Sequence, residues 1–417
     1  MVKAVQFMKN VVVLEFEWRD LPLTSQSRLL LQVIGANFST TLRKLVLRAR
    51  ISNFAEFLTI SDFNNVDEID FHFDYVTHDP QDPLDIVLEV EGKGLVVVVA
   101  PFINRRARHL RSLIVSSSSR VDLSPFFQLL GPLPKVAHLG LHISFESAHL
   151  SDPNPLVNLF VRSRASPKRV DFIPNPPDTY SDDHCRVQPG WTNVARLLQA
   201  RAECLHNLVF VELPYTTPDT TFPILTRSVS TLQHLKLTGN FLTRDEIEGF
   251  LGVFAKFPFQ LIHLRIGVRV LDLSLLALLA QRLPALRSLI LIYERASAYY
   301  DSTDIERVGC PYKGVDHFKI KHAVPAFEGW PLEELSFYHG RYVTPAPTIP
   351  FYERGRSYYP TAGHITTSFN IQFGLAFLDK IPSLCQVGGY AIPQILLPPC
   401  ICFAKWAEGI ETMKRVH

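Results

Sequence analysis

The chain has almost no excess of either charge. In 417 residues, 42 Lys and Arg stand against 40 Asp and Glu, which leaves a formal net charge of +2. Proteins dedicated to nucleic-acid binding usually carry a strong basic excess, so this balance argues against a nucleic-acid partner. Cysteine is also scarce, because six residues at this length are too few for a scaffold held by disulfides. Hydrophobic residues make up 47%, which excludes a disordered chain.

Long apolar runs are missing as well. The longest, Leu95–Ile103, has about half the length that a membrane-spanning helix needs. Near the N-terminus, Val11–Leu14 is followed at once by Glu15 and Glu17, without the small-residue cleavage site of a signal peptide. We therefore expect a soluble protein of the cytoplasm or nucleus that is monomeric and has no membrane partner.

Motifs for catalysis and cofactor binding are absent too. Glu91–Gly94 lacks the upstream glycine and the Ser or Thr of a phosphate-binding loop, and G-x-S-x-G, H-E-x-x-H, C-x-x-C and G-x-G-x-x-G do not occur. Cys400 and Cys402 lack the spacing and second ligand pair of a zinc finger. We predict no catalytic residue, cofactor or metal. His184–Cys185 keeps a hydrolase-type enzyme on an α/β fold as the least favoured alternative, because a catalytic partner can be distant in sequence.

The sequence does contain a recurring six-residue pattern with apolar residues at its first, fourth and sixth positions. Most copies begin at a spacing close to the ~20–29 residues of a leucine-rich repeat, and longer steps fit inserted loops. The copies are Val11–Phe16, Leu42–Leu47, Val66–Phe71, Leu110–Val115, Val136–Leu141, Pro167–Phe172, Leu205–Phe210, Leu232–Leu237, Leu261–Ile266, Leu286–Leu291, Val315–Ile320 and Leu332–Phe337. They predict an α/β leucine-rich-repeat solenoid, with a curved parallel sheet on the concave side and helices on the convex side. The alternative is an ordinary α/β domain with buried parallel strands.

The segments between these copies favour a strand–helix unit. Apolar residues at helical spacing predict helices at Leu21–Phe38, Leu123–Leu130, Asn193–Cys204, Thr243–Phe257 and Leu271–Leu283. A degenerate further copy of the pattern is expected around Leu84–Val90. Ser144–Pro155 and Pro174–Pro189, rich in Pro, Asp and Ser, are predicted to be exposed loops.

The rhythm changes toward the C-terminus. We predict that residues 1–340 form the irregular solenoid. Residues 341–417 are predicted to form an irregular segment rich in aromatics and proline, followed by a capping helix within Ile392–His417.

The pattern resembles the leucine-rich-repeat region of F-box proteins, especially the divergent fungal families. The strand motifs carry this resemblance over Val11–Phe337, with a proline in the preceding turn at Gly131–Val136 and Arg282–Leu286. Leu232–Asn240 keeps the asparagine of the standard repeat, whereas the other copies lack it. The resemblance implies a protein-protein interaction scaffold, the substrate-recognition part of a ubiquitin-ligase subunit. No F-box is visible, so a ligase adaptor is an expected partner only if an F-box exists upstream, and a free-standing interaction protein is the alternative.

The residues between the apolar positions of each strand are expected on the concave face. They include Glu15, Glu17, Lys44, Arg48, Glu68, Asp70 and His72 early in the chain, His138, His142, Arg169 and Asp171 in the middle, and Glu334 and Tyr338 at the end. We predict that an acidic partner segment binds the later, basic part of this face. The predicted binding residues are His234, Lys236, His263, Arg265, Ile290, Ile292, His317, Lys319 and Lys321.

Two other interpretations apply to this face. The first is that these side chains are solvated and have no special role. The second concerns His138, His234, His263 and His317, which share one position of the pattern. The Leu205 and Leu286 copies interrupt that row, so we predict no metal site in it.

Overall fold

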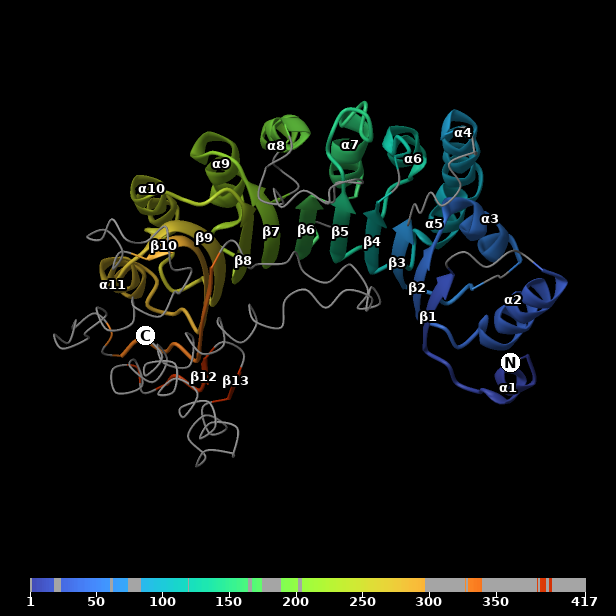
Figure 1. The fold of residues 1–417 in the computed structure, drawn as a ribbon, viewed down its shortest axis with the longest axis horizontal. Helices are drawn as coiled ribbons and strands as arrows, with labels where there is room; N and C mark the ends of the chain where they lie inside the picture. Colours follow the sequence, from blue (N-terminus) through green and yellow to red (C-terminus); the bar gives the residue numbers. More distant parts are fainter. Residues whose placement is uncertain are drawn as a thin grey trace, which may run out of the picture. The chain divides into compact units, whose positions relative to one another are not determined.

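The computed structural model of the protein describes residues 2–18, 24–60, 63–73, 84–118, 120–163, 167–174, 189–201, 205–296, 327, 329–339, 381, 383–387 and 390–391. The chain divides into two compact units, Met1–Asn240 and Phe241–His417, called unit 1 and unit 2 below. Both are α/β, and parallel strands are joined through helices across unit 1 and between β9 and β10 of unit 2 (Figure 1). None of the helices in the described ranges is long and apolar enough to cross a membrane.

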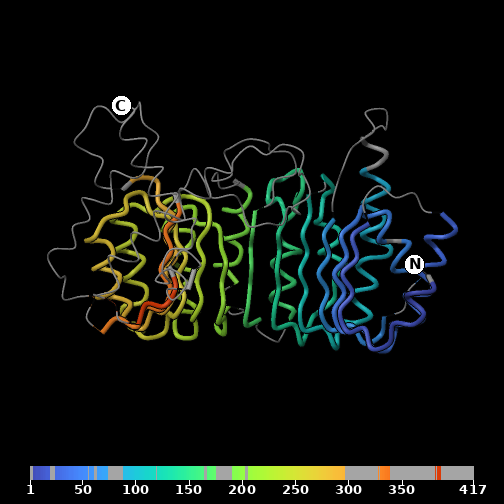
Figure 2. The backbone as a smooth tube through the Cα atoms, turned by 60° about the horizontal axis from the view of Figure 1, so that its bottom comes forward, coloured from blue at the N-terminus to red at the C-terminus, as the bar shows by residue number. Residues whose placement is uncertain are grey.

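The sheet of unit 1 is parallel throughout, and its strands lie side by side in chain order (Figures 1 and 2). Its strands are β1 (Val13–Trp18), β2 (Lys44–Ala49), β3 (Glu68–Phe73), β4 (Ser112–Ser117), β5 (His138–Ile143), β6 (Arg169–Pro174), β7 (Phe210–Tyr215) and β8 (His234–Gly239). Except at β7, each strand begins two residues after the first position of a predicted copy. The predicted ladder of strands is therefore confirmed for unit 1, apart from that copy.

One face of this sheet packs against helices and forms the core. Leu45, Leu47 and Ile69 are at most 1% exposed. Across the two layers, the rings of Phe54 and Phe71 lie 5.0 Å apart, and those of Phe160 and Phe172 lie 5.5 Å apart. The apolar positions of the sequence pattern thus point toward the helices, because side chains alternate along each strand.

The helices of unit 1 from α2 to α9 lie on that same side of the sheet (Figure 1). They are α1 (Val2–Phe7), α2 (Ser25–Phe38), α3 (Ile51–Ile60), α4 (Leu84–Gly94), the π-helix η1 (Leu95–Val99), α5 (Ala100–Arg106), α6 (Ser124–Leu129), α7 (Asn154–Arg162), α8 (Pro189–Ala200) and α9 (Pro218–Ser228). The predicted helices Leu21–Phe38, Leu123–Leu130 and Asn193–Cys204 correspond to α2, α6 and α8, with shifted ends.

The opposite side of the sheet, which we call the open face, carries three registered rows of side chains. No helix of the described residues lies over it in unit 1 (Figure 1). The rows are Val13, Lys44, Glu68, Ser112, His138, Arg169, Phe210 and His234; Glu15, Val46, Asp70, Ile114, Gly140, Asp171, Glu212 and Lys236; and Glu17, Arg48, His72, Ser116, His142, Ile173, Pro214 and Thr238. The third row is interrupted between β6 and β7, where pairing stops after Asp171 and Glu212.

The predicted copy around Leu84–Val90 is wrong, because this segment forms helix α4 and continues through η1 into α5. Leu95, Val99 and Ile103 follow one another at intervals of four and are buried. This spacing places them on one side of a helix, whereas a strand would bury alternate residues. The long apolar run of this region therefore packs as a helix.

The predicted copy Leu205–Phe210 is displaced by three residues. Residues 205–207 form a turn, and strand β7 begins only at Phe210. The buried residues that fit the pattern are Leu208, Val211 and Leu213. Phe210, predicted as a core residue, consequently lies on the open face.

The segment Ser144–Pro155 is not the exposed loop that its composition suggests. Phe145 is 1% exposed, and its ring centroid lies 5.1 Å from that of Trp191 on α8. His149 and Leu150 are buried as well. A few apolar residues thus anchor this insertion to the helix layer, and they outweigh its polar majority.

Unit 2 repeats the strand–helix arrangement over a shorter length. It contains α10 (Arg244–Phe254), β9 (His263–Leu271), α11 (Leu273–Arg282), β10 (Ser288–Ala296), β11 (Glu334–His339), β12 (Gln386–Val387) and β13 (Tyr390–Ala391). Strands β9 to β12 are parallel, and β13 is antiparallel to β12. Thr243 caps α10, because its Oγ1 accepts a hydrogen bond from the Glu246 backbone N–H at 3.3 Å. In return, the Thr243 N–H donates to Glu246 Oε2 at 2.7 Å.

The predicted helices Thr243–Phe257 and Leu271–Leu283 are confirmed as α10 and α11, both somewhat shorter. The predicted strand Val315–Ile320 and the predicted capping helix within Ile392–His417 lie outside the described residues, as do most of Pro174–Pro189 and of residues 341–417. The predicted change of organisation after residue 340 therefore stays a prediction.

Two helical glycines give a matched test of this packing. A Cβ on Gly190 of α8 would lie 1.5 Å from the Phe145 carbonyl oxygen, whereas a Cβ on Gly252 of α10 would meet nothing within 4 Å. We expect Gly190→Ala to lower the free energy of unfolding by about 2 kcal/mol through overpacking. Gly252→Ala should raise it by about 0.5–1 kcal/mol, because alanine loses less backbone entropy in a helix. Urea denaturation measures both, and a stabilising Gly190→Ala would contradict the packing of Phe145 on α8.

Candidate binding surface on the open face of the sheet

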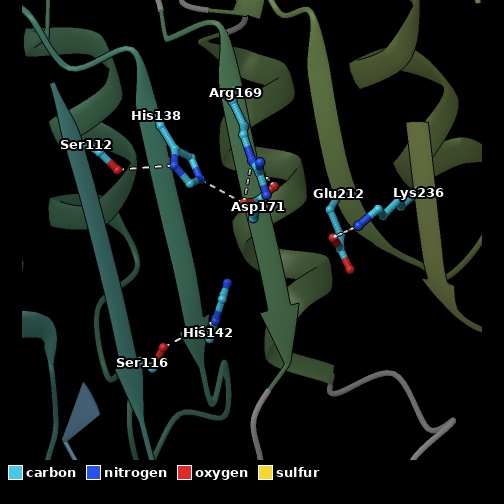
Figure 3. Close-up of polar contacts among 8 residues, drawn as sticks. All are labelled: Ser112, Ser116, His138, His142, Arg169, Asp171, Glu212 and Lys236. Atoms are coloured by element: carbon cyan, nitrogen blue, oxygen red, sulfur yellow. Dashed lines mark hydrogen bonds and ion pairs between the residues drawn. The ribbon is translucent and has the colours of Figure 1, made fainter. Parts of the chain in front are cut away.

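Polar and aromatic side chains from five neighbouring strands gather on the later part of the open face. They come from the first and third positions of strands β4 to β8. The parallel register therefore brings them into two adjoining rows. Figure 3 shows Arg169 and Asp171 on β6, between His138 on one side and the Glu212–Lys236 pair on the other. We call Arg169, Asp171, Phe210, Glu212 and Lys236 the central cluster.

His138 connects the central cluster to β4. Its Nε2 lies 2.8 Å from Asp171 Oδ2, and its Nδ1 lies 3.1 Å from Ser112 Oγ (Figure 3). Nε2–H donates to the carboxylate, and in the neutral imidazole the Ser112 hydroxyl donates to Nδ1. Both ring nitrogens of His138 are therefore occupied within the protein.

Asp171 is the buried anion beneath this group. Its side chain is 4% exposed, and Arg169 Nε donates to Asp171 Oδ2 at 3.0 Å. Burial alone would raise the pKa of the Asp171 carboxyl, but the hydrogen bond from His138 and the charge of Arg169 outweigh it and hold the pKa below its usual value. The carboxylate thus stays ionised and fixes both basic side chains.

Phe210 lies between the two cations of the central cluster. The Arg169 guanidinium carbon is 4.1 Å from its ring centroid, and Lys236 Nζ is 5.2 Å from it. Lys236 Nζ also lies 3.4 Å from Glu212 Oε2. On the β8 side the His234 ring stacks on Phe210, with centroids 5.8 Å apart. Each cation is thus held by a carboxylate and by the Phe210 ring: Arg169 by Asp171, and Lys236 by Glu212.

His142 makes a second contact between β5 and β4. Its Nδ1 lies 3.2 Å from Ser116 Oγ, while its Nε2 is buried and has no hydrogen-bond partner in the described residues (Figure 3). Gly140, two residues before it, stands in the neighbouring row and has no side chain, and a Cβ there would lie 3.1 Å from Ile114. Burial lowers the pKa of His142, against the opposite pull of the Asp171 and Asp70 charges.

The predicted binding residues are divided between the two units. His234 and Lys236 lie on β8 of unit 1, as expected, but Lys236 is paired with Glu212. His263 and Arg265 lie on β9 of unit 2. His317, Lys319 and Lys321 lie outside the described residues.

Ile290 and Ile292 lie on β10 of unit 2, in register with Arg265 and Gly267 of β9. Next to them, Ser288 Oγ donates to Glu334 Oε2 at 2.6 Å. Burial lowers the pKa of His263. This part of the predicted surface therefore combines two isoleucines with one arginine and a serine–glutamate pair.

Sequence reasoning missed Phe210, Glu212 and Ser112 as members of the surface. For the first two, the cause is the displaced copy at residue 205, since the correct register, beginning at Leu208, places both on the open face. Ser112 precedes an apolar run and carries no signal of its own. Its partner His138 becomes evident only when β4 and β5 are paired.

The described parts of the chain contain no group of three or more His, Cys, Asp or Glu residues that could hold a metal ion. A pocket lined by His206, Pro218, Phe222 and Arg227 lies along α9, and none of these residues belongs to the central cluster. No protein-family model and no curated protein matches this chain. A proposal for its function therefore rests on the fold and on the contacts of the open face.

His142 makes the stability of unit 1 depend on pH. Because its pKa in the folded protein lies below the value of about 6.5 of an unfolded histidine, the unfolded state binds the proton more readily. The contribution of neutral His142 to the free energy of unfolding is fully present above pH ~6.5. It is lost as the pH falls from there through the lower pKa that His142 has in the folded protein. We expect His142→Asn, which keeps a polar group toward Ser116, to reduce the dependence of the urea midpoint on pH in this range.

The matched control for that measurement is His206→Asn, at an exposed position. It should leave the pH dependence as in the wild type. Identical pH profiles for wild type and His142→Asn would contradict the effect of burial on His142.

Proposed function

We propose that this protein is a non-catalytic scaffold of the leucine-rich-repeat type that binds a protein partner through the open face. Repeated strand–helix units, with helices on one face of the sheet and no helix of the described ranges over the other, support the repeat class. In such an array each repeat contributes the outward side chains of one strand to an extended surface, and that surface suits binding of a large ligand.

The observation that carries this proposal is the fixed arrangement of the central cluster. Arg169 is held by Asp171 and by Phe210, and Lys236 by Glu212 and the same ring. Side chains that are ordered before binding lose less conformational entropy when a partner arrives. Arginine and aromatic residues are also enriched among the residues that dominate protein interfaces. A row of independently solvated side chains would not require these cross-strand contacts.

Among the described residues, the chain of contacts from Ser112 through His138 to Asp171 is the feature that favours a hydrolase. Serine, histidine and aspartate are the residue types of a catalytic triad. Acyl transfer also needs free N–H donors for the oxyanion, and the Ser112 backbone N–H already donates to Asp67 O at 3.2 Å. In addition, Asp171 is shared with Arg169, whose charge competes for the carboxylate that would stabilise a protonated His138. The three residues fit a structural network better than a catalytic one.

Within the scaffold class, two roles use the same surface. One is the substrate-recognition part of a ubiquitin ligase, and the other is a free-standing interaction protein. Both predict a partner on the open face, but only the first predicts that a ligase adaptor co-purifies with the full-length protein. The co-purification experiment therefore separates them without affecting the proposed binding surface.

A pair of threonines in unit 1 tests the proposed surface. Thr238 lies on β8 at an open-face position, and Thr226 is exposed on α9 on the helix side. We expect a photo-crosslinking amino acid at position 238 to capture a specific cellular partner and the same group at position 226 to capture none. Crosslinked products are compared by mass spectrometry after identical irradiation. Capture of one partner with equal yield from both positions, or only from position 226, would contradict binding through the open face.

A further inference from the structure

We propose that the central cluster recognises an acidic, extended peptide segment, whose carboxylates are bound by Arg169 and Lys236 on either side of Phe210. This inference rests on the proposed function and adds the chemistry of the partner. It differs from the basic surface predicted from the sequence, because Arg169 and Phe210 were not among the predicted binding residues.

The charges that a partner meets at this surface are positive. The side chains of Arg169 and Lys236 are 45% and 36% exposed, whereas those of Asp171 and Glu212 are 4% and 9% exposed. The carboxylates therefore lie beneath the cations, where they fix their positions. Although the cluster is neutral in total, its accessible part is cationic.

Arg169 presents unused hydrogen-bond donors. Its Nε donates to both carboxylate oxygens of Asp171, at 3.0 and 3.3 Å, and its guanidinium lies over Phe210. Its terminal nitrogens have no hydrogen-bond partner among the described residues. A guanidinium held in this way offers a planar pair of N–H groups that matches a carboxylate, and little side-chain entropy remains to be lost.

Lys236 supplies a second cation at a useful distance. It comes from β8, two strands away from β6, which corresponds to roughly 9–10 Å across the sheet. In an extended peptide, side chains on one side repeat at roughly 6.6–6.8 Å, so two acidic side chains with one residue between them can reach both cations. Phe210 lies between the cations and offers its apolar edge to the intervening part of the ligand. The pattern that fits is acidic–any–acidic.

The test uses the full-length protein and a fluorescein-labelled octapeptide of alternating glutamate and threonine. Binding is measured by fluorescence anisotropy at 50 mM salt, with an alternating glutamine–threonine octapeptide as the uncharged control. We expect the wild type to bind the glutamate peptide and not the glutamine peptide. Arg169→Gln and Lys236→Gln should each raise the dissociation constant at least about tenfold, a size typical of losing one charge-assisted hydrogen bond.

Two further variants serve as controls for a loss of folding and for unspecific charge effects. Arg169→Lys keeps a cation beside Asp171 but removes the planar donor pair, so it should stay folded by thermal melting and bind several times more weakly. Arg162→Gln removes an exposed arginine on α7, on the helix side, and should bind like the wild type.

The inference is overturned if the wild type does not bind the glutamate peptide, or if folded Arg169→Lys and Lys236→Gln bind it as the wild type does. It is also overturned if oligothymidine displaces the peptide at a lower concentration than unlabelled peptide, since a nucleic acid would then be the better ligand. Any of these results together with partner capture from position 238 would leave the proposed function intact. Failure of capture from position 238 would reject the proposed function itself.

Discussion

The parallel backbone ladder of unit 1 is the constraint on which its surface depends. The N–H that opens each strand donates to the residue before the neighbouring strand: Glu68 N to Arg43 O at 3.0 Å, Ser112 N to Asp67 O at 3.2 Å, and Arg169 N to Ala137 O at 2.9 Å. Because these bonds recur in the same register, equivalent positions of successive repeats stand in rows. A shift of one residue in any strand would exchange its buried and open-face side chains.

The register of the parallel strands has two consequences. It buries the apolar side chains against the helices, and it aligns the polar side chains on the open face. Leucine, valine and phenylalanine side chains fill the space between the strands and helices, where removal of apolar surface from water is the main stabilising term. The same alternation leaves Asp171 beside Glu212 and places a ring between two cations. Two buried carboxylates on adjacent strands are tolerated because each has its own cation. The polar surface is thus as specifically packed as the core.

The sequence pattern predicts most of this fold because strand burial alternates with a period of two. At Leu42 and Val66 the pattern has only one possible register, and β2 and β3 begin where it requires. At Leu205 it has two, since Leu205 and Leu208 both precede apolar residues at suitable intervals. Only the turn at residues 205–207 decides between them. Around Leu84 the apolar residues are compatible with either a strand or a helix. The structure shows which one forms, because it buries every fourth residue of the following run.

The surface is harder to predict than the fold. Arg169, Asp171 and His138 are placed on the correct face by alternation alone. The contacts of His138 with Ser112 and with Asp171, however, join residues of different strands that are 26 and 33 positions apart in sequence. The sequence also suggests that Lys236 is a free cation, whereas the register pairs it with Glu212.

The position of residue 210 tests the account most directly. Single cysteines at Phe210 and Val211 are treated with a water-soluble thiol reagent under native conditions, and the modification of each peptide is followed by mass spectrometry. We expect rapid modification at 210, on the open face, and protection at 211 until the protein unfolds. Protection at 210 with rapid modification at 211 would contradict the register of β7 and, with it, the central cluster.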